Sequence, residues 1–521
     1  MMFDRKRQNI AKNNCRRKES GRDLLKRIVF FELHMKKQRF QIIKTISAFF
    51  LMVLFFLTFY LLLWKLQLFY TFEKITRHKT IFFISMIYCM VMYGFLSFLE
   101  GLKVGERRLL DLIFGFFTSA VFVNVIAVCV CSVFKAFYFK KIFLFGIILI
   151  LFQTLTGFVW IMWCHRLYEK YQFQKEAVFI YGSREDSGEY IRVINTINEY
   201  FRISKSICYE IGILQVESQI QYSSVVFLGD IPVDVRNKIL KYCMKNKIDC
   251  YSIPKISDIY IQNAYVMQLN DKFLLRYPLL EIEKWQRVWK RILDIVVSCL
   301  MLICFSPVML VIAIAIKNED GGKILYAQER VTMNRQPFLM YKFRSMHENA
   351  EQDGIMLARK NDNRITKVGH VIRNLHFDEL PQLIHVLRGE MSLVGPRPER
   401  QEYIAAYAEK IPEFSDRLKV KAGLTGYAQV YGRYNTEPED KIKYDLYYIY
   451  NHSFWLDLKI LILTVRILFQ KENTEGVDEG EWRAIPRKRM VNGEKKGRIS
   501  HSMNGSDDVD NNTRDKKERE N

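Results

Sequence analysis

Two adjacent carboxylates, Asp378 and Glu379, precede an apolar-periodic stretch of the sequence. The apolar residues that follow have the i, i+3, i+4, i+7 spacing of one helix face: Leu380, Leu383, Ile384 and Leu387. Pro381 is tolerated in a first helical turn, and Gly389 is a typical stop. We therefore expect the acid pair at a helix N-terminus, where free N–H groups and the positive dipole end favour anions.

Four arginines flank the acid pair in the sequence: Arg364, Arg373, Arg397 and Arg400. Carboxylates that can hold a metal ion, together with guanidinium groups and a helix N-terminus, predict a phosphate–metal site. The alternative is structural. Asp378 would then cap a helix, Glu379 would sit in its first turn, and the arginines would pair with surface acids.

The composition indicates a membrane protein. The chain has 521 residues, a formal net charge of +22 and 50% hydrophobic residues, a balance that fits either nucleic-acid or membrane proteins. Four long stretches have no charged residue, and a bilayer core needs about 20 apolar residues per helix: they are residues 45–64, 80–99, 112–134 and 142–164. We therefore expect a lipid bilayer as the partner and no nucleic acid.

The distribution of basic residues predicts the orientation. The first 44 residues carry 14 Lys and Arg against 4 Asp and Glu, which places the N-terminus in the cytoplasm by the positive-inside rule. Four spans return the chain to the cytoplasm. The expected organisation has five parts: a basic cytoplasmic leader at 1–44, four transmembrane helices at 45–165, a cytoplasmic α/β module at 176–275, a membrane-associated unit at 286–471 and a disordered tail at 472–521.

The segment 176–275 alternates predicted strands and helices, which favours a small, Rossmann-like parallel α/β module. The predicted strands are residues 177–182, 225–228 and 250–253. The spacing Gly182-x5-Gly188 differs from the G-x-G-x-x-G fingerprint of dinucleotide sites. A ligand-binding role and a structural or regulatory role both stay open for this module.

Residues 295–316 form an uncharged run that contains Ser306-Pro307 at its centre. Proline removes a helical hydrogen bond and clashes with the preceding turn. We expect a break there and a re-entrant helical hairpin of two short legs; a kinked fifth span is the alternative. A later apolar run, 454–469, contains Asp457, Lys459 and Arg466. It is expected to lie on the membrane because three central charges disfavour insertion.

Residues from about 286 to 470 resemble the bacterial sugar transferase family, the polyprenyl-phosphate hexose-1-phosphate transferases. The matching motifs follow one another in order: Lys290-Arg291-x-x-Asp294, Ser306-Pro307, Tyr326-x-Gln328-Glu329-Arg330-Val331, Tyr341-Lys342-Phe343-Arg344-Ser345-Met346, Arg373, Asp378-Glu379-Leu380-Pro381-Gln382-Leu383, Leu393-Val394-Gly395-Pro396-Arg397-Pro398-Glu399 and Gly423-Leu424-Thr425-Gly426-Tyr427-Ala428-Gln429-Val430. The spans and the α/β module also resemble the long form of the family, including undecaprenyl-phosphate glucose and galactose phosphotransferases.

The resemblance implies transfer of a sugar-1-phosphate from a UDP-sugar to polyprenyl phosphate at the inner leaflet of a bacterial cytoplasmic membrane, which starts an exopolysaccharide, capsule or other glycan. It implies that Asp378 is the nucleophile, that Glu379 helps to hold Mg²⁺, and that Arg373 and Arg397 contact phosphate. A carboxylate has a reference pKa near 3.9, so it is ionised at pH 7 and can attack phosphorus without a separate base.

Other positions carry weaker expectations. Six residues of the matching motifs are candidates for substrate binding: Lys342, Arg344, Gly423, Thr425, Gly426 and Gln429. Lys342 and Arg344 could instead be interfacial cations, and the other four could serve only the fold. Asp445 is interpreted as an ordinary surface or helix acid and His376 as a structural residue. Thr332, Arg335 and Ala422 depart from the family pattern, which leaves loop geometry and sugar preference open.

Two other classes of function compete with a sugar-phosphate transferase. One is a catalytically inactive membrane scaffold or sensor of glycan assembly. The other is a membrane-anchored, nucleotide-dependent oxidoreductase working through residues 176–275, which the absent glycine fingerprint disfavours. The sugar, the polyprenol, the pathway and the oligomeric state, a homo-oligomer included, stay open at this point.

Overall fold

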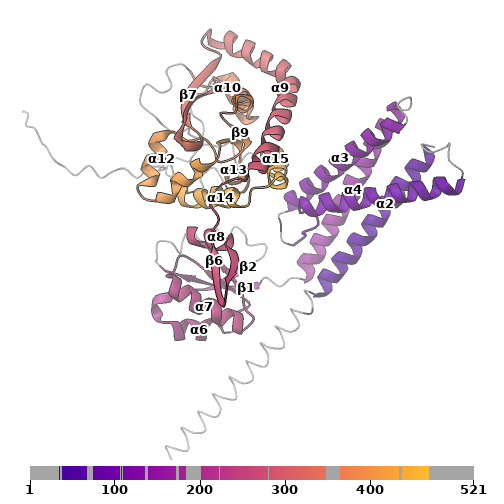
Figure 1. The fold of residues 1–521 in the computed structure, drawn as a ribbon. Helices are drawn as coiled ribbons and strands as arrows, with labels where there is room; N and C mark the ends of the chain where they lie inside the picture. The colour runs from indigo at the N-terminus through magenta and orange to yellow at the C-terminus, as the bar shows by residue number, and fades with distance from the viewer. Residues whose placement is uncertain are drawn as a thin grey trace, which may run out of the picture.

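The computed structural model describes residues 35, 38–66, 74–105, 107, 109–134, 139–171, 175–182, 201–221, 223–279, 281–347, 364–432 and 437–468. Most of the basic leader and the whole C-terminal tail therefore lie outside the described residues. The described chain is mostly helical and carries a small parallel sheet. Figure 1 shows the apolar N-terminal helices beside two further units.

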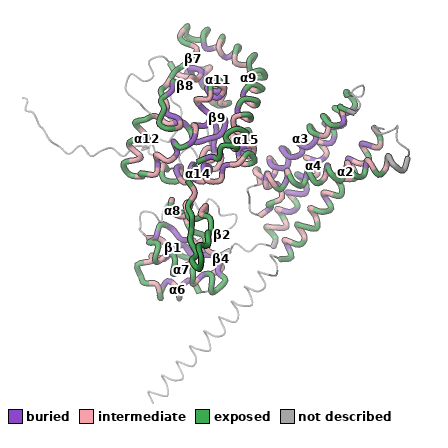
Figure 2. Tube along the Cα trace, in the orientation of Figure 1, coloured by how far each residue is buried: buried purple, intermediate pink, exposed green. Residues whose placement is uncertain are grey.

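Long apolar helices occupy the four uncharged stretches, as predicted. They are Gln38–Lys65, α2 (Lys74–Phe98), α3 (Leu109–Phe134) and α4 (Phe139–Tyr171). The later helix α9 (Lys284–Asp320) makes five helices that are long and apolar enough to cross a membrane in the described part of the chain. Bulky apolar residues are exposed along these helices, as expected for surfaces that contact lipid, and Figure 2 colours many of their residues as exposed.

Three polar side chains within the N-terminal helices bind one another. The hydroxyl of Tyr88 donates to Asn124 Oδ1 at 3.0 Å, Asn124 Nδ2 donates to Gln153 Oε1 at 2.7 Å, and Gln153 Nε2 donates to the Tyr88 hydroxyl at 2.7 Å. All three residues are buried. Such interhelical hydrogen bonds stabilise helix association inside a bilayer, so this polar cluster joins α2, α3 and α4.

The predicted α/β module contains a four-stranded parallel sheet in the order β2-β1-β3-β4. Its elements are β1 (Lys175–Tyr181), β2 (Phe201–Cys208), η2 (Tyr209–Ile211), α6 (Ile213–Ile220), β3 (Val225–Leu228), α7 (Val233–Lys245), β4 (Asp249–Ser252) and α8 (Ile256–Gln262). The three expected strands are confirmed, and β2 is an additional one. The antiparallel hairpin of β5 (Tyr265–Leu269) and β6 (Lys272–Arg276) follows.

Helix α9 corrects one expectation about Ser306-Pro307. It is a single continuous helix with Pro307 inside it, so the predicted break into two separate legs is wrong; Figure 1 shows a helix that bends instead. Pro307 has no N–H for the carbonyl of Ile303, four residues earlier. The Ser306 hydroxyl donates to that carbonyl at 2.9 Å. The serine thereby replaces the missing donor and keeps the helix intact.

Both ends of α9 contact the same C-terminal unit. Near its start, Lys290 Nζ donates to Asp457 Oδ2 at 2.7 Å and to the Val394 carbonyl at 2.8 Å. At its end, Asp320 forms an ion pair with Arg344 through two hydrogen bonds. A straight helix of this length would separate its ends by about 55 Å. The C-terminal unit therefore lies along α9 rather than at one end of it (Figure 1).

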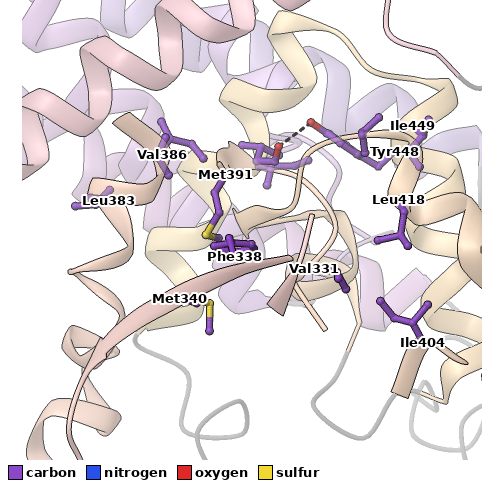
Figure 3. Packing of buried hydrophobic residues seen from close by; sticks show 14 of the residues in the cluster. Val331, Phe338, Met340, Leu383, Val386, Met391, Ile404, Leu418, Tyr448 and Ile449 are labelled. Atoms are coloured by element: carbon purple, nitrogen blue, oxygen red, sulfur yellow. Dashed lines mark hydrogen bonds between the residues drawn. The ribbon is translucent and has the colours of Figure 1, made fainter. Parts of the chain in front are cut away.

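The C-terminal unit is mostly helical, as predicted, and also contains four short strands in the described part of the chain. After α9 its elements are β7 (Leu325–Val331), η3 (Met333–Arg335), β8 (Pro337–Phe343), α10 (Lys367–Asn374), η4 (Phe377–Glu379), α11 (Gln382–Arg388), β9 (Ser392–Val394), α12 (Gln401–Ala408), η5 (Pro412–Lys419), β10 (Gly423–Thr425), α13 (Tyr427–Tyr431), α14 (Pro438–Tyr450) and α15 (Phe454–Leu468). They enclose one apolar core, part of which Figure 3 shows.

We predict that Asp294→Ala destabilises this unit by about 2–4 kcal/mol, because it leaves two buried donors unpaired. Asp294 Oδ1 accepts from the Ser392 hydroxyl at 3.0 Å and from the Leu393 N–H at 2.9 Å. Thermal unfolding of the full chain in detergent, followed by fluorescence, measures the effect. Leu300→Ala, at an exposed position of α9, is the control. Equal unfolding midpoints for the two variants would contradict the prediction.

Candidate active site

The acid pair lies in a tight turn directly before helix α11. His376 precedes it in the left-handed conformation (φ 55°), and Phe377, Asp378 and Glu379 form the 3₁₀ turn η4. Pro381 caps α11, and Gly389 ends it with a φ of 84° and an N–H bond to the His385 carbonyl at 3.0 Å. The expected position of the pair at a helix start and the expected stop are both confirmed.

The buried face of this segment differs from the expected one. Leu380, Leu383 and Val386 are buried, whereas Ile384 is 40% exposed. The buried residues of α11 are Gln382, Leu383, His385 and Val386, so the buried face includes two polar residues and leaves out Ile384. His385 is also buried, and its Nε2 accepts the Tyr341 N–H at 3.1 Å.

The carboxylate of Glu379 is held between two cations from distant parts of the chain. Lys342 Nζ, at the end of β8, lies 2.8 Å from Glu379 Oε1, and an Arg397 nitrogen lies 2.9 Å from the same oxygen. Burial alone would raise the pKa of Glu379, but Lys342 and Arg397 outweigh it and lower the pKa well below its ordinary value. Glu379 is therefore a stable anion.

Asp378 lies in a different electrostatic environment from its neighbour. Its carboxylate has no hydrogen-bond or ion-pair partner within the described ranges. Burial, together with the adjacent charge of Glu379, raises its pKa, while Lys342, Arg373 and His376 act in the opposite direction. Arg373 thus acts on Asp378 through its field, without a direct ion pair. A carboxylate left unpaired and destabilised as an anion is a stronger nucleophile than an ordinary one.

Two glycine-containing loops meet behind Arg397. The Gly395 N–H donates to the Thr425 carbonyl, and the Gly423 N–H donates to the Pro396 carbonyl, both at 2.8 Å. A Cβ on Gly423 would lie 2.1 Å from the Gly395 nitrogen, so only glycine permits this approach of the two backbones. The contact fixes the loop that carries Arg397 after β9.

The remaining predicted loop residues surround the same contact. A Cβ on Gly426 would lie 2.1 Å from the Gly395 carbonyl oxygen. The Thr425 hydroxyl contacts the Thr464 hydroxyl of α15 at 2.7 Å, and Gln429 Nε2 donates to the Leu424 carbonyl at 3.4 Å. Gly423, Thr425, Gly426 and Gln429 therefore lie next to the Arg397 loop. Their contact with substrate stays a prediction.

The structure separates the two predicted cations Lys342 and Arg344. Lys342 reaches the acid pair, whereas Arg344 is buried and bound to Asp320 at the end of α9. Strand β8 ends at Phe343, so the two-residue periodicity that would place both side chains on one face no longer applies. Ser306 and Pro307, where the sequence predicted the break of a re-entrant hairpin, lie inside α9 and carry no ionisable group.

A buried ionic cluster near the Arg397 loop was missed or misassigned from the sequence. Asp445 is buried rather than on the surface, and an Arg417 nitrogen lies 3.0 Å from it. Lys441 Nζ lies 2.5 Å from Glu399. The burial of Asp445 could have been predicted from the sequence, because Ile442, Asp445, Leu446 and Ile449 share the apolar face of α14 at helical spacing. An acid at a core position of that face indicates a buried partner.

The donor set of the acid pair fits a magnesium ion that binds together with a phosphate ligand. The described part of the chain contains no cluster of three or more Asp, Glu, His or Cys that could hold a metal. Mg²⁺ is usually bound by one or two carboxylates plus substrate phosphates and water. Both hydrogen bonds to Glu379 go to Oε1, so its Oε2 and the Asp378 carboxylate remain as oxygen ligands.

Comparison with known proteins matches this unit to one family. The model of the bacterial sugar transferase family matches residues 285–471. The chain is 42% identical over 189 residues to the UDP-glucose:undecaprenyl-phosphate glucose-1-phosphate transferase of Caulobacter vibrioides; the match covers 35% of this chain and 71% of the relative. The chain belongs to the bacterial sugar transferase family, as the motifs of its C-terminal unit indicated.

Two further relatives match over a smaller part of their length. The UDP-N-acetylgalactosamine-undecaprenyl-phosphate N-acetylgalactosaminephosphotransferase of Aeromonas hydrophila is 38% identical over 237 residues, 44% of this chain and 55% of the relative. The UDP-glucose:undecaprenyl-phosphate glucose-1-phosphate transferase of Klebsiella pneumoniae is 46% identical over 183 residues, 34% of this chain and 39% of the relative. The matched segment therefore spans about half of these two relatives or less.

We predict that Gly423→Ala lowers stability by about 1–3 kcal/mol, the usual cost of overpacking, and loosens the Arg397 loop. The added methyl would collide with backbone rather than with a movable side chain. Thermal unfolding and hydrogen exchange at residues 395–397 measure the two effects. Gly94→Ala is the control, since its Cβ would meet nothing within 4 Å. Unchanged exchange at 395–397 would contradict the proposed role of the glycine contact.

Proposed function

We propose that this protein transfers a sugar-1-phosphate from a UDP-sugar to polyprenyl phosphate, releases UMP and so starts an exopolysaccharide, capsule or other glycan. The names of its relatives support the two substrate classes. The observation that carries the proposal is the acid pair itself. An unpaired carboxylate, Asp378, lies beside a carboxylate held by two cations, Glu379, and this arrangement suits attack on a diphosphate.

The reaction proceeds by two displacements at one phosphorus atom. In the first, an Asp378 oxygen bonds to the phosphorus that carries the sugar, and the bond from that phosphorus to the bridging oxygen breaks, so UMP leaves with the electron pair. In the second, a phosphate oxygen of polyprenyl phosphate bonds to the same phosphorus and the bond to Asp378 breaks. The products are a diphosphate-linked lipid sugar and the regenerated Asp378 carboxylate.

Electrostatic repulsion between the carboxylate and the diphosphate is the main obstacle to this attack. Lys342 and Arg397 already face the acid pair, and Arg373 adds a positive field at Asp378. A guanidinium can grip two phosphate oxygens at once, so Arg373 and Arg397 would hold the donor. Mg²⁺, held by Glu379 and the diphosphate, would neutralise charge on the leaving phosphate.

The position of α9 supports a site at the membrane surface. Phe305 on α9 contacts Phe377 of the catalytic turn, with ring centroids 6.0 Å apart, so the acid pair lies near the middle of this apolar helix. Since both ends of α9 bind the same C-terminal unit, both ends lie on one side of the membrane. Helix α9 therefore dips into one leaflet and returns, which brings a water-soluble donor and a lipid-borne acceptor to one surface.

Contacts with the N-terminal helices support the cytoplasmic side. On α15, Lys459 lies 3.0 Å from Glu100 and Arg466 lies 2.5 Å from Asp111. Glu100 and Asp111 flank the connection between α2 and α3, which two spans place on the same side as the N-terminus. The catalytic unit accordingly lies at the cytoplasmic face of the bacterial inner membrane, with α15 along its surface.

A catalytically inactive scaffold or sensor of glycan assembly is the alternative function. It would need the family fold but not an intact nucleophile or phosphate-binding cations. Asp378, Glu379, Lys342 and Arg397 are all present, and three of them are in direct contact. Enzymatic transfer therefore accounts better for the charges at this site.

We predict that Asp378→Asn abolishes transfer, because an amide cannot displace the leaving phosphate. Membranes containing the full chain are incubated with Mg²⁺, polyprenyl phosphate and a panel of labelled UDP-sugars, and label in the lipid fraction is measured. Without polyprenyl phosphate, mass spectrometry of the wild-type protein should detect a sugar-phosphate adduct on Asp378. Glu409→Gln, a change of an acid outside the site, is the control. Transfer by Asp378→Asn at the wild-type rate would refute covalent catalysis.

A second prediction concerns α9. In a chain whose ten native cysteines are replaced, Lys284→Cys and Lys323→Cys bracket the helix. A membrane-impermeant maleimide added to intact cells should label neither, and both should react once the inner membrane is permeabilised. Lys140→Cys, at the start of α4, should react from outside and is the positive control. Labelling of Lys323→Cys in intact cells would show that α9 crosses the membrane.

A further inference from the structure

Arg417, in η5, is a buried arginine that the proposed reaction does not use directly. Its side chain is 2% exposed. One guanidinium nitrogen donates to the backbone carbonyl of Arg397 at 3.0 Å and lies 3.0 Å from Asp445. The guanidinium also lies over the Phe414 ring, 5.0 Å from its centroid. A buried charge is kept only where it is paired, so this arrangement requires an explanation.

The contacts of Arg417 converge on one loop. Its other terminal nitrogen lies 3.9 Å from Glu399, two residues after Arg397. Glu399 is also bound by Lys441 at 2.5 Å, and the Glu399 carbonyl accepts the Val331 N–H at 3.2 Å. The segment from Arg397 to Glu399 is thus held through its backbone carbonyls and through the Glu399 carboxylate. Arg417 contacts the Arg397 carbonyl and faces the Glu399 carboxylate, and Asp445 balances the charge of Arg417.

The side chain of Arg397, unlike that of Arg417, is partly exposed. It is 43% exposed and reaches Glu379 at 2.9 Å. A long exposed side chain can occupy many rotamers, so the position of its backbone limits where the guanidinium can go. A small displacement of a substrate-positioning group is enough to lower a rate strongly. The direction of Arg397 toward the acid pair therefore depends on the grip on its carbonyl.

We propose that Arg417 is a positioning residue for transfer: it fixes the Arg397 backbone and so aims the Arg397 guanidinium at the diphosphate of the donor. This inference rests on the proposed function. Arg417 acts through Arg397 and does not itself contact the substrate. Its forked guanidinium suits this place because one terminal nitrogen serves the Arg397 carbonyl and Asp445 while the other faces Glu399, an arrangement that the single ammonium of a lysine cannot reproduce.

The test is a double-mutant cycle in the full chain, with the UDP-sugar that the wild type uses. Arg417→Lys should lower kcat/KM for that donor by at least about tenfold. The loss should come mainly through the KM of the donor, while the KM of polyprenyl phosphate changes by less than about threefold. In a chain that already carries Arg397→Ala, adding Arg417→Lys should lower kcat/KM by less than about a further threefold, because the effects of coupled residues are not additive.

Independent losses that multiply in the double variant would overturn the proposal, as would an Arg417→Lys variant with wild-type kcat/KM. Arg335→Lys is the matched control: Arg335 is an exposed arginine that contacts the same η5 segment through Ser415 at 3.4 Å, and its replacement should leave both KM values unchanged. Thermal unfolding reports the folded state of each variant. If Arg417→Lys does not fold, the cycle is run with Glu399→Gln, which loosens the same loop and should show the same non-additivity with Arg397→Ala.

Absence of transfer by wild-type membranes with every UDP-sugar would instead refute the proposed function. Additive losses in an active enzyme would refute only the positioning role of Arg417. The two failures are therefore distinguishable in one set of measurements.

Discussion

The ionic contact at Glu379 Oε1 is the constraint on which the geometry of the site depends. Three segments that are distant in sequence meet there: the end of β8 through Lys342, the turn η4 through Glu379, and the loop after β9 through Arg397. A buried carboxylate without its cations would be strongly destabilised. The same two cations would face the diphosphate of the donor. One contact therefore serves both the fold and the charge balance of the reaction.

The loops around this contact are built from close backbone approaches rather than from large side chains. Gly395 and Gly423 lie so near to each other that a methyl group would not fit between them. The Arg417 side chain also donates a hydrogen bond to the Arg397 carbonyl. Backbone-to-backbone contacts have few alternative arrangements, so they position a long arginine better than side-chain packing would. This explains why glycines and a buried ionic cluster occur together at this loop.

The sequence predicted the features that depend on local composition. The apolar helices, three strands of the small parallel sheet and the acid pair at a helix start follow from charge-free length, alternation and the Pro381 and Gly389 signals. Features that depend on tertiary contacts were not predictable. The burial of His385 accompanies its hydrogen bond from the Tyr341 N–H, and the turn of Arg344 toward Asp320 follows from the end of β8. The Ser306 hydroxyl keeps α9 continuous where Pro307 alone predicted a break.

The arrangement of α9 also addresses how two chemically different substrates reach one carboxylate. A UDP-sugar is too polar to enter a bilayer, and a polyprenyl chain is too apolar to leave it. A helix that crossed the bilayer would give the acid pair no special access to the lipid phosphate. In the proposed arrangement, a helix held at both ends by Lys290 and Asp320, with its middle beside Phe377, would keep the acid pair close to the membrane. The acceptor phosphate would then approach along the membrane surface while the donor arrives from water, and neither substrate would have to leave its own phase.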